Sequence, residues 1–291
     1  MKLFKRRYAV GTEQGTPPGT DGAGFRGTLV TAVSDTGCVR RNNEDNYLLD
    51  IYINESCGNR SEVSAFLPWR PSGWNLIGIF DGMGGGEKGE LAALVTAQEF
   101  RNAARELLTA PTGAEADEIL RRAFRRANDR AVELQARYGT YGTTGTVVCT
   151  NGEVFKIYHL GDSRAYLLRQ QELFQLTRDH TLARMKLEAG LYQEDDPQVE
   201  RDKNRLTEYI GRDEAGGNLC PEESKWIPAA AGDCILLCSD GLYDMCPATE
   251  IRKILNQGAD NRCKTGMLVQ RALERGGRDN VTCICLDFAQ K

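Results

Sequence analysis

Histidine is scarce in this sequence: its 291 residues contain only two, His159 and His180. A Ser-His-Asp triad or a zinc site with several histidines would have to use one or both of them. Long hydrophobic runs are also missing, because the apolar stretches are short, as in CILLC (234–238), whereas a membrane-spanning helix needs about 20 such residues. The first ten residues, MKLFKRRYAV, are basic but lead into no apolar segment. We therefore expect neither a secretory signal nor a membrane span.

A basic excess is lacking as well, since the formal net charge is −4. This balance argues against a protein built mainly to bind nucleic acid, which normally carries many more basic than acidic residues. The ten cysteines include no C-x-x-C pair, and four of them lie in apolar runs: Cys234, Cys238, Cys283 and Cys285. Free cysteine is commonly a small buried hydrophobic residue. We expect reduced core thiols in a cytoplasmic protein rather than a thiolate metal site.

The chain divides into a short leader and one long domain. Residues 1–27 combine KRR with a Gly/Pro/Thr-rich stretch and predict a flexible leader. No linker clearly divides residues 28–291, which we interpret as one domain. Within it we expect residues 54–73 to form a surface loop and the charged residues 178–217 to form a mobile insertion.

Hydrophobic periodicity predicts the helices and strands of the domain. The expected strands are 28–34, 45–53, 74–80, 143–150, 153–160, 163–169, 172–177, 234–239 and 281–288. Asn151-Gly152 is a strong signal for a hairpin between two of them. The expected helices are 87–108, 114–136, 247–257 and 262–275. This order indicates an α+β fold rather than a regular βαβ alternation.

Carboxylates recur at the ends of apolar strands. Asp81 follows LIGIF, Asp162 follows YHLG, Asp240 follows CILLCS, and Asp279 comes just before VTCICLDF. Asn43-Glu44-Asp45 adds acidic groups at the start of another strand. A single Asp-Gly is usually a plain turn, but several carboxylates that converge cannot all stay ionised without a cation. Oxygen ligands without histidine or thiolate favour Mg²⁺ or Mn²⁺.

Seven motifs occur in an order and spacing that span residues 28 to 288. They are RRNNEDN (40–46), GIFDGMGG (78–85), GTTGT (142–146), HLGDSRAYL (159–167), LTRDHTL (176–182), LLCSDGLYD (236–244) and GGRDNVT (276–282). Together they resemble the metal-dependent serine/threonine protein phosphatases of type 2C, the PPM family, in their bacterial form. The resemblance implies two antiparallel β-sheets packed face to face and flanked by α-helices, a four-layer αββα sandwich.

The resemblance also implies a site with two ions, Mn²⁺ or Mg²⁺, and in bacterial-type members a third. On the matching positions, Asp81 bridges the two ions, and Asp240 and Asp279 hold the first. Glu44, through water, and the carbonyl of Gly82 serve the second. The remaining implied positions are Asp162, which with Asp240 matches the third ion, and Asp45 and Asn280, which orient the ligands.

The activity implied is hydrolysis of phosphoserine and phosphothreonine in proteins by a water shared between the metal ions, with Asp81 and Asp240 central to catalysis. Arg40 matches the arginine that grips the phosphate, since its guanidinium suits two phosphate oxygens at once. The alternative for Arg40 is a surface arginine like its neighbour Arg41. We expect a cytoplasmic monomer that acts on phosphorylated protein substrates, with a cognate Ser/Thr kinase as partner.

Two positions depart from the family pattern. Met83 stands where some members have a histidine that serves as acid for the leaving group, which favours a bacterial-like enzyme with water in that role. Gly86 and Glu87 stand where bacterial-type members usually have a histidine. For His180 we expect a structural or flap-positioning role rather than catalysis. The insertion 178–217 corresponds to the flap beside the metal site, where we expect substrate choice to lie.

Three alternatives remain open. Gly84-x-Gly86-x-x-Gly89 formally matches a dinucleotide-binding fingerprint, but a lone match of this kind is weak. A binding module could keep the fold without turnover, although none of the expected metal aspartates is missing. An enzyme of the same fold could act on phosphorylated anti-sigma antagonists, which differs in substrate and not in chemistry. Such enzymes usually carry a sensor domain, for which the leader offers no room.

Overall fold

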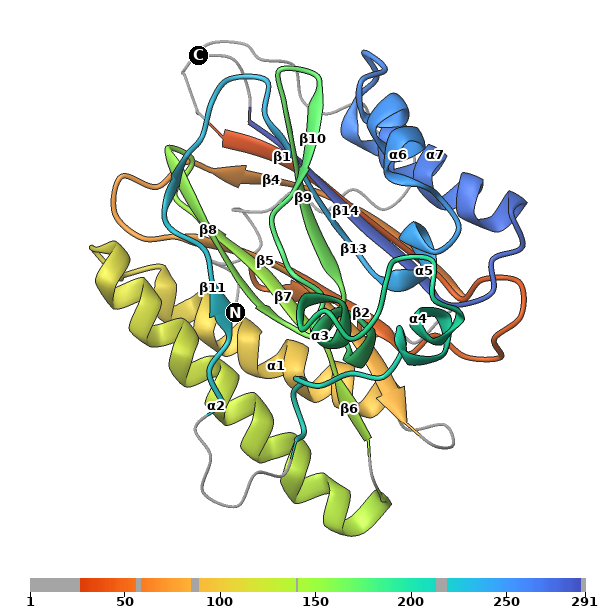
Figure 1. Ribbon diagram of the computed structural model, residues 1–291. Helices are drawn as coiled ribbons and strands as arrows, with labels where there is room; N and C mark the ends of the chain where they lie inside the picture. Colours follow the sequence, from red (N-terminus) through yellow and green to blue (C-terminus); the bar gives the residue numbers. More distant parts are fainter. Residues whose placement is uncertain (1–26, 56–58, 85–88, 140, 213–218, 289–291) are drawn as a thin grey trace.

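The computed structural model describes residues 27–55, 59–84, 89–139, 141–212 and 219–288 (Figure 1). The predicted leader lies outside the described residues apart from Gly27. Among the residues described, none of the helices has the length and hydropathy that a membrane span requires.

Two antiparallel sheets form the centre of the molecule. The six-stranded sheet has the order β10 (Glu172–Gln175), β9 (Arg164–Arg169), β13 (Cys234–Cys238), β14 (Val281–Asp287), β1 (Gly27–Asp35) and β4 (Arg60–Pro68). The eight-stranded sheet has the order β11 (Glu222–Glu223), β8 (Val154–Leu160), β7 (Gly145–Thr150), β5 (Asn75–Gly84), β2 (Asp45–Leu49) and β3 (Tyr52–Ile53). Two short strands complete it: β12 (Ile227–Pro228) pairs with β8, and β6 (Tyr141–Thr143) pairs with β5.

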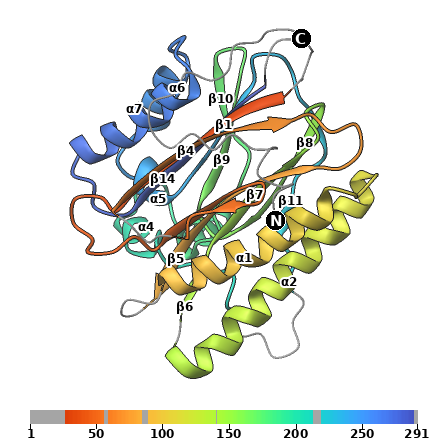
Figure 2. The ribbon, with the colours of Figure 1, turned by 180° about the vertical axis from the view of Figure 1, so that it is seen from behind.

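The sheets pack face to face and each is covered by helices on its outer side (Figures 1 and 2). Buried aliphatic side chains of both sheets, such as Ile79 and Ile284, fill the space between them. Helices α1 (Gly89–Leu107) and α2 (Gly113–Tyr138) cover the eight-stranded sheet, and α6 (Ala248–Leu255) and α7 (Asn261–Glu274) cover the other. The predicted αββα sandwich is confirmed.

The prediction of a surface loop over residues 54–73 is wrong. Nine of these residues form β4, which pairs with β1 from Gly27↔Pro68 to Asp35↔Arg60. Only Val63 and Leu67 of β4 are buried, and Ala65 packs partly against the same core, because β4 is an edge strand. So few apolar positions gave only a weak period-two signal in the sequence. The strand expected over 45–53 is likewise interrupted, between β2 and β3, at Asp50, which has a φ of 56°.

The flap, residues 178–217, contains helices that the sequence analysis did not predict. Its described part contains α3 (Leu182–Glu188) and α4 (Pro197–Asp202), which begin after the N-caps Thr181 and Asp196. The buried carboxylate of Asp202 accepts hydrogen bonds from Lys186 Nζ at 2.6 Å and from Tyr192 Oη at 3.0 Å, and so joins the two helices. Residues 213–218 lie outside the described residues.

The cysteines are free in the described part of the chain, as expected. Six are buried: Cys149, Cys234, Cys238, Cys246, Cys283 and Cys285. The expectation of core thiols is wrong for Cys38, Cys220 and Cys263, which are exposed because they lie in loops and at a helix start rather than in apolar strands.

Candidate metal centre

The strand ends that carry the predicted aspartates meet at one end of the sandwich, around a cavity of about 220 Å³. It is lined by Arg40, Glu44, Asp81, Gly82, Met83, Gly84, Thr144, Asp162, Asn204, Leu206, Asp240 and Asp279. All the predicted ligands are therefore on one cavity, together with the predicted phosphate-binding arginine. Asp45 and Asn280, predicted to orient the ligands, are buried next to the lining residues and do not line the cavity themselves.

The carboxyl groups of the cavity repel one another. Burial raises the pKa of Asp81 well above its ordinary value, and the carboxylates of Asp45 and Asp240 raise it further. Burial raises the pKa of Asp240 in the same way, with further contributions from Asp162 and Asp279. Burial also raises the pKa of Asp162 to about 7. These groups cannot all be charged at neutral pH unless a cation joins them.

The donor set fits a hard divalent cation by its chemistry. The described residues of the lining offer carboxylate and carbonyl oxygens, and none of them is a histidine or cysteine. Behind it, Asp45 Oδ2 accepts hydrogen bonds from Ser239 Oγ at 2.8 Å and Thr282 Oγ1 at 2.7 Å. Its Oδ1 is buried with no hydrogen-bond partner among the described residues, and Asp45 lies opposite Asp81 in the β2–β5 ladder. In the described part of the chain, however, no three His, Cys, Asp or Glu side chains are gathered tightly enough to hold an ion as they stand.

Arg40 reaches the acidic cavity from the loop between β1 and β2. Its Nη2 lies 2.6 Å from Asp279 Oδ2, and this hydrogen bond raises the pKa of the Arg40 guanidinium. The two side chains remain 51% and 34% exposed, so the pair is open to solvent. Arg40 therefore faces the cavity and one of its predicted ligands, whereas the alternative was a plain surface arginine.

Asn280 joins the two loops that carry Glu44 and Asp279. Its Oδ1 accepts a hydrogen bond from the Glu44 amide at 2.8 Å, and its Nδ2 donates to the carbonyls of Thr36 and Asn42, each at 2.9 Å. Its own amide donates to Asp279 Oδ1 at 2.9 Å. The side-chain amide of Asn280 thus holds the backbone of Glu44, and the backbone amide of Asn280 holds the Asp279 carboxylate.

Several residues around the cavity were not predicted to act there. The Asp81 amide donates to Thr144 Oγ1 at 2.9 Å, and Thr143 Oγ1 donates to the Asp81 carbonyl at 2.9 Å. Both threonines lie in the GTTGT motif (142–146). Two hydroxyl groups beside strand glycines were the one feature of the sequence that could have indicated a role near the site. Asn204 and Leu206 come from the flap, which was expected beside the metal site, although neither residue was singled out.

Gly82 and Gly241 follow the two central aspartates because no side chain fits there. A Cβ on Gly82 would lie 2.2 Å from the carbonyl oxygen of Gly89. The nearest obstacle to a side chain at Gly82 is therefore the backbone of Gly89, the first residue of helix α1. Gly241 stands in the short helix α5 (Asp240–Tyr243), which the sequence did not predict, and a Cβ on it would lie 2.0 Å from the Asn280 carbonyl oxygen.

Gly241→Ala is expected to destabilise the protein by about 2 kcal/mol or more, because the methyl group must displace backbone that cannot move freely. Gly266→Ala is the matched control. Gly266 is also helical, but a Cβ on it meets nothing within 4 Å, so alanine is expected to leave stability unchanged or raise it by about 0.5–1 kcal/mol. Urea unfolding of both variants measures the difference in the free energy of unfolding. Equal values for the two variants would show that the Asn280 backbone moves away from the new methyl group without a loss of stability.

Of the positions that depart from the family pattern, Met83 lines the cavity, whereas Gly86 and Glu87 lie outside the described residues. The sheet pairing also bears on the dinucleotide alternative. The strand before the Gly84-x-Gly86-x-x-Gly89 match, β5, pairs antiparallel with β2, β6 and β7. A dinucleotide fingerprint needs a parallel βαβ unit, so the described sheets do not support that alternative.

Comparisons with known proteins agree with this geometry. The family model of protein phosphatase 2C matches residues 51–207, more than half of the chain. The serine/threonine phosphatase stp of Listeria monocytogenes is 29% identical over 263 residues, which cover 89% of this chain and 96% of the relative.

Two solved structures show the same fold. The serine/threonine phosphatase of S. agalactiae has a TM-score of 0.76 and 25% sequence identity, and the match covers 90% of this chain and 100% of that one. The catalytic domain of the phosphatase PstP, in complex with two manganese ions, has a TM-score of 0.66 and 29% identity, covering 89% of this chain and 99% of that one. The chain therefore belongs to the protein phosphatase 2C family, and it is a bacterial-type member.

Proposed function

We propose that this chain hydrolyses phosphoserine and phosphothreonine in proteins with the help of Mn²⁺ or Mg²⁺ ions bound in the acidic cavity. Membership of the family makes it a protein serine/threonine phosphatase. The observation that supports the metal-dependent mechanism is the meeting of mutually repelling carboxyl groups from separate strands around one cavity. The two manganese ions of the PstP structure support the same choice of metal.

The proposed ligands follow the sequence prediction. Asp81 would serve two ions, with Asp240 and Asp279 on the first and Glu44 and the Gly82 carbonyl on the second. Asp162, together with Asp240, would serve a third. When bound, such ions lower the pKa of a water molecule and neutralise negative charge on the phosphate.

The chain's own residues then bind and orient the substrate. Arg40, at the rim of the cavity, would bind two phosphate oxygens and would give up its contact with Asp279 to do so. Met83 cannot donate a proton, so in our proposal the leaving alkoxide takes its proton from water. Asn204 and Leu206 on the flap would contact the rest of the substrate.

Metal removal tests the proposed function. A phosphothreonine peptide should be hydrolysed in Mn²⁺, not measurably hydrolysed in excess EDTA, and hydrolysed again after Mn²⁺ is restored. Turnover that persists in EDTA would contradict the metal-dependent mechanism. No turnover by the Mn²⁺-loaded protein on a panel of phosphopeptides would instead favour the alternative of a binding module.

Arg40→Ala is expected to raise KM for a phosphopeptide by about 10- to 100-fold, because a charge-assisted hydrogen bond contributes about 1.5–3 kcal/mol. Arg41→Ala is the matched control, since Arg41 is an exposed neighbour that does not line the cavity. Arg40→Lys should leave the KM nearly as high as in Arg40→Ala, because an ammonium group lacks the planar pair of N–H donors that binds two phosphate oxygens at once. Equal KM values for the two alanine variants would remove Arg40 from the phosphate site.

The remaining expectations are also proposals. We propose a cytoplasmic monomer whose substrates include the targets of a Ser/Thr kinase. A pull-down that recovers neither a kinase nor a kinase substrate would contradict the partnership. Hydrolysis of phosphorylated anti-sigma antagonists in preference to other phosphoproteins would favour the alternative substrate class.

A further inference from the structure

His180 lies at the base of the flap, in the segment 177–181 between β10 and α3, which we call the flap base. Its side chain is 7% exposed, and its ring centroid lies 4.8 Å from that of His159. The flap base faces the residues that follow β8, where Gly161 and Asp162 lead to the metal cavity. The only two histidines of the chain thus meet at the junction of the flap and the loop that carries Asp162.

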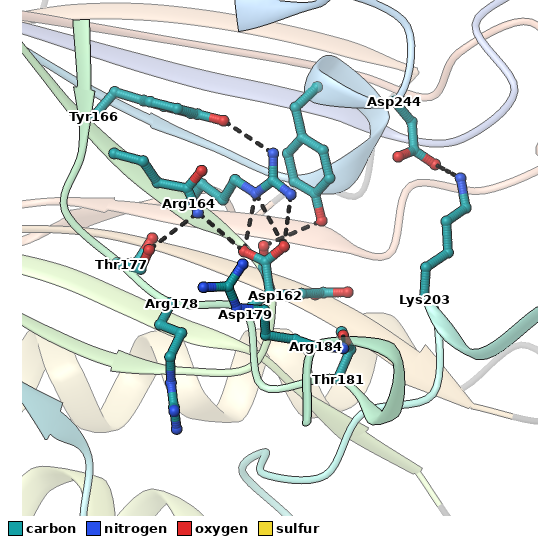
Figure 3. A network of polar contacts seen from close by, with 12 residues as sticks. Asp162, Arg164, Tyr166, Thr177, Arg178, Asp179, Thr181, Arg184, Lys203 and Asp244 are labelled. Atoms are coloured by element: carbon teal, nitrogen blue, oxygen red, sulfur yellow. Dashed lines mark hydrogen bonds and ion pairs between the residues drawn. The ribbon is translucent and has the colours of Figure 1, made fainter. Parts of the chain in front are cut away.

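The backbone and charged side chains hold this junction together. The His180 amide donates to the Gly161 carbonyl at 2.7 Å, and the Ala165 amide donates to Thr177 Oγ1 at 3.1 Å. Arg164 binds Asp179 with two nitrogens, Nε at 2.9 Å and Nη2 at 2.5 Å. Figure 3 shows the Arg164 guanidinium directed at Asp179, with Asp162 beside it.

Hydrogen-bond partners determine which nitrogen of each ring carries the proton. His180 Nδ1 lies 3.3 Å from the Gly161 amide, which can only donate, so Nδ1 must be the acceptor. His180 Nε2 lies 3.0 Å from Glu222 Oε2 and therefore carries the hydrogen. His159 Nε2 faces the Arg178 carbonyl at 3.0 Å, so it also carries a hydrogen. Burial lowers the pKa of His159 to about 3, so its ring is neutral.

His180 thus makes two hydrogen bonds with Gly161. Its ring nitrogen Nδ1 accepts from the Gly161 amide, and its backbone amide donates to the Gly161 carbonyl. The next residue, Asp162, is 6% exposed, and its carbonyl accepts a hydrogen bond from Tyr243 Oη at 3.2 Å. Tyr243 lies on α5, the helix that begins with Asp240. The Gly161–Ser163 loop therefore connects the flap base to both aspartates assigned to the third ion.

We propose that His180 is a positioning residue: its neutral Nε2–H tautomer holds the Gly161 amide with Nδ1 and thereby fixes Asp162 in the metal cavity. The role of Asp162 as a ligand rests on the proposed function. The position of the loop does not, because the contacts of His180 are made by the protein alone. The contact of Nδ1 with Gly161 is the essential one, and the contact of Nε2 with Glu222 selects the tautomer.

A matched pair of variants separates the two ring nitrogens. The side-chain amide of asparagine reaches about as far as Nδ1, and that of glutamine about as far as Nε2. In the metal-free full chain, His180→Gln should speed hydrogen exchange of the Gly161 amide about tenfold, the equivalent of one lost hydrogen bond. His180→Asn should keep exchange within about twofold of wild type. Arg184→Gln is the control, since Arg184 forms an exposed pair with Glu188 in the flap, and it should change nothing at Gly161.

The wild-type protein provides a second test that no folding defect can obscure. With two histidines in the chain, ¹H–¹⁵N spectra of the imidazole groups at pH 7 can be assigned with one His159→Gln variant. We expect both rings as Nε2–H tautomers. An Nδ1–H or doubly protonated His180, or equal Gly161 exchange in the asparagine and glutamine variants, would overturn the proposal.

Calorimetric titration with Mn²⁺ tests whether the contact of His180 with Gly161 affects metal binding at Asp162. His180→Gln should weaken the lowest-affinity Mn²⁺ site about tenfold, by the same lost hydrogen bond, and leave the tighter sites as in wild type. Equal weakening of every site would overturn the specific link to Asp162. If the wild-type protein binds no Mn²⁺, the proposed function fails, whereas Gly161 exchange and the tautomer still decide the role of His180.

Discussion

Asp240→Asn is expected to lower kcat on a phosphothreonine peptide by about 10³-fold, which corresponds to about 4 kcal/mol of transition-state stabilisation. The same variant is expected to make the metal-free protein more stable, by about 1–3 kcal/mol. Burial and the charges of Asp162 and Asp279 raise the pKa of Asp240, so its carboxylate is an unfavourable group in the absence of a cation. Asparagine keeps the shape and removes the charge.

Two measurements at pH 7.5 check the prediction: kcat in saturating Mn²⁺, and the urea midpoint in EDTA. Asp195→Asn is the control, because Asp195 is an exposed aspartate of the flap and its loss should change neither quantity. Full activity of Asp240→Asn in Mn²⁺ would remove Asp240 from the catalytic centre. A lower urea midpoint in EDTA would show that the carboxylate is stabilised by the protein itself.

The metal-free protein is expected to lose stability as the pH rises from about 4 to about 7.5. Burial raises the pKa of Asp162 to about 7 and that of Asp45 to about 6, from an ordinary value of 3.8. The folded state therefore holds more protons than the unfolded state in this window. Stability from these groups is fully present below pH 3.8 and is lost as the pH passes the folded-state values.

The expected loss is at most about 7 kcal/mol in total, because a pKa difference of one between the folded and unfolded states corresponds to about 1.4 kcal/mol, and the interaction of the two groups with their neighbours lowers it. Unfolding by urea at several pH values in EDTA measures it, and Asp162→Asn isolates the contribution of one group, because the variant should lose less across the window. Saturating Mn²⁺ should abolish most of the loss in wild type. A stability that rises steadily to pH 7.5 in EDTA, with no difference in Asp162→Asn, would contradict the prediction.

Much of the site was predictable from local sequence. A buried strand that ends in an aspartate, as LIGIF does at Asp81, places a carboxylate at the edge of the core whatever the topology. The repetition of this pattern at Asp162, Asp240 and Asp279 indicated convergence, and all of these residues line one cavity. The roles of the individual ligands remain predictions until metal binding is measured.

The missed features depend on partners far away in the sequence. Strand β4 is recognisable only from its pairing with β1, since just two of its side chains are buried. Thr144 acts through a hydrogen bond to a residue 63 positions away. The proton on each nitrogen of His180 depends on Gly161, in the loop after β8, and on Glu222, in β11.

The sequence by itself determined which chemical groups the cavity receives: oxygen donors at strand ends and an arginine ahead of them. Only the tertiary structure decided which hydroxyls, amides and imidazole nitrogens hold those donors in place. The physical reason is that a charge at the end of a buried strand is a local property of the chain, whereas a hydrogen bond also requires a partner at the right distance and direction. That partner is supplied by the packing of the two sheets and the flap.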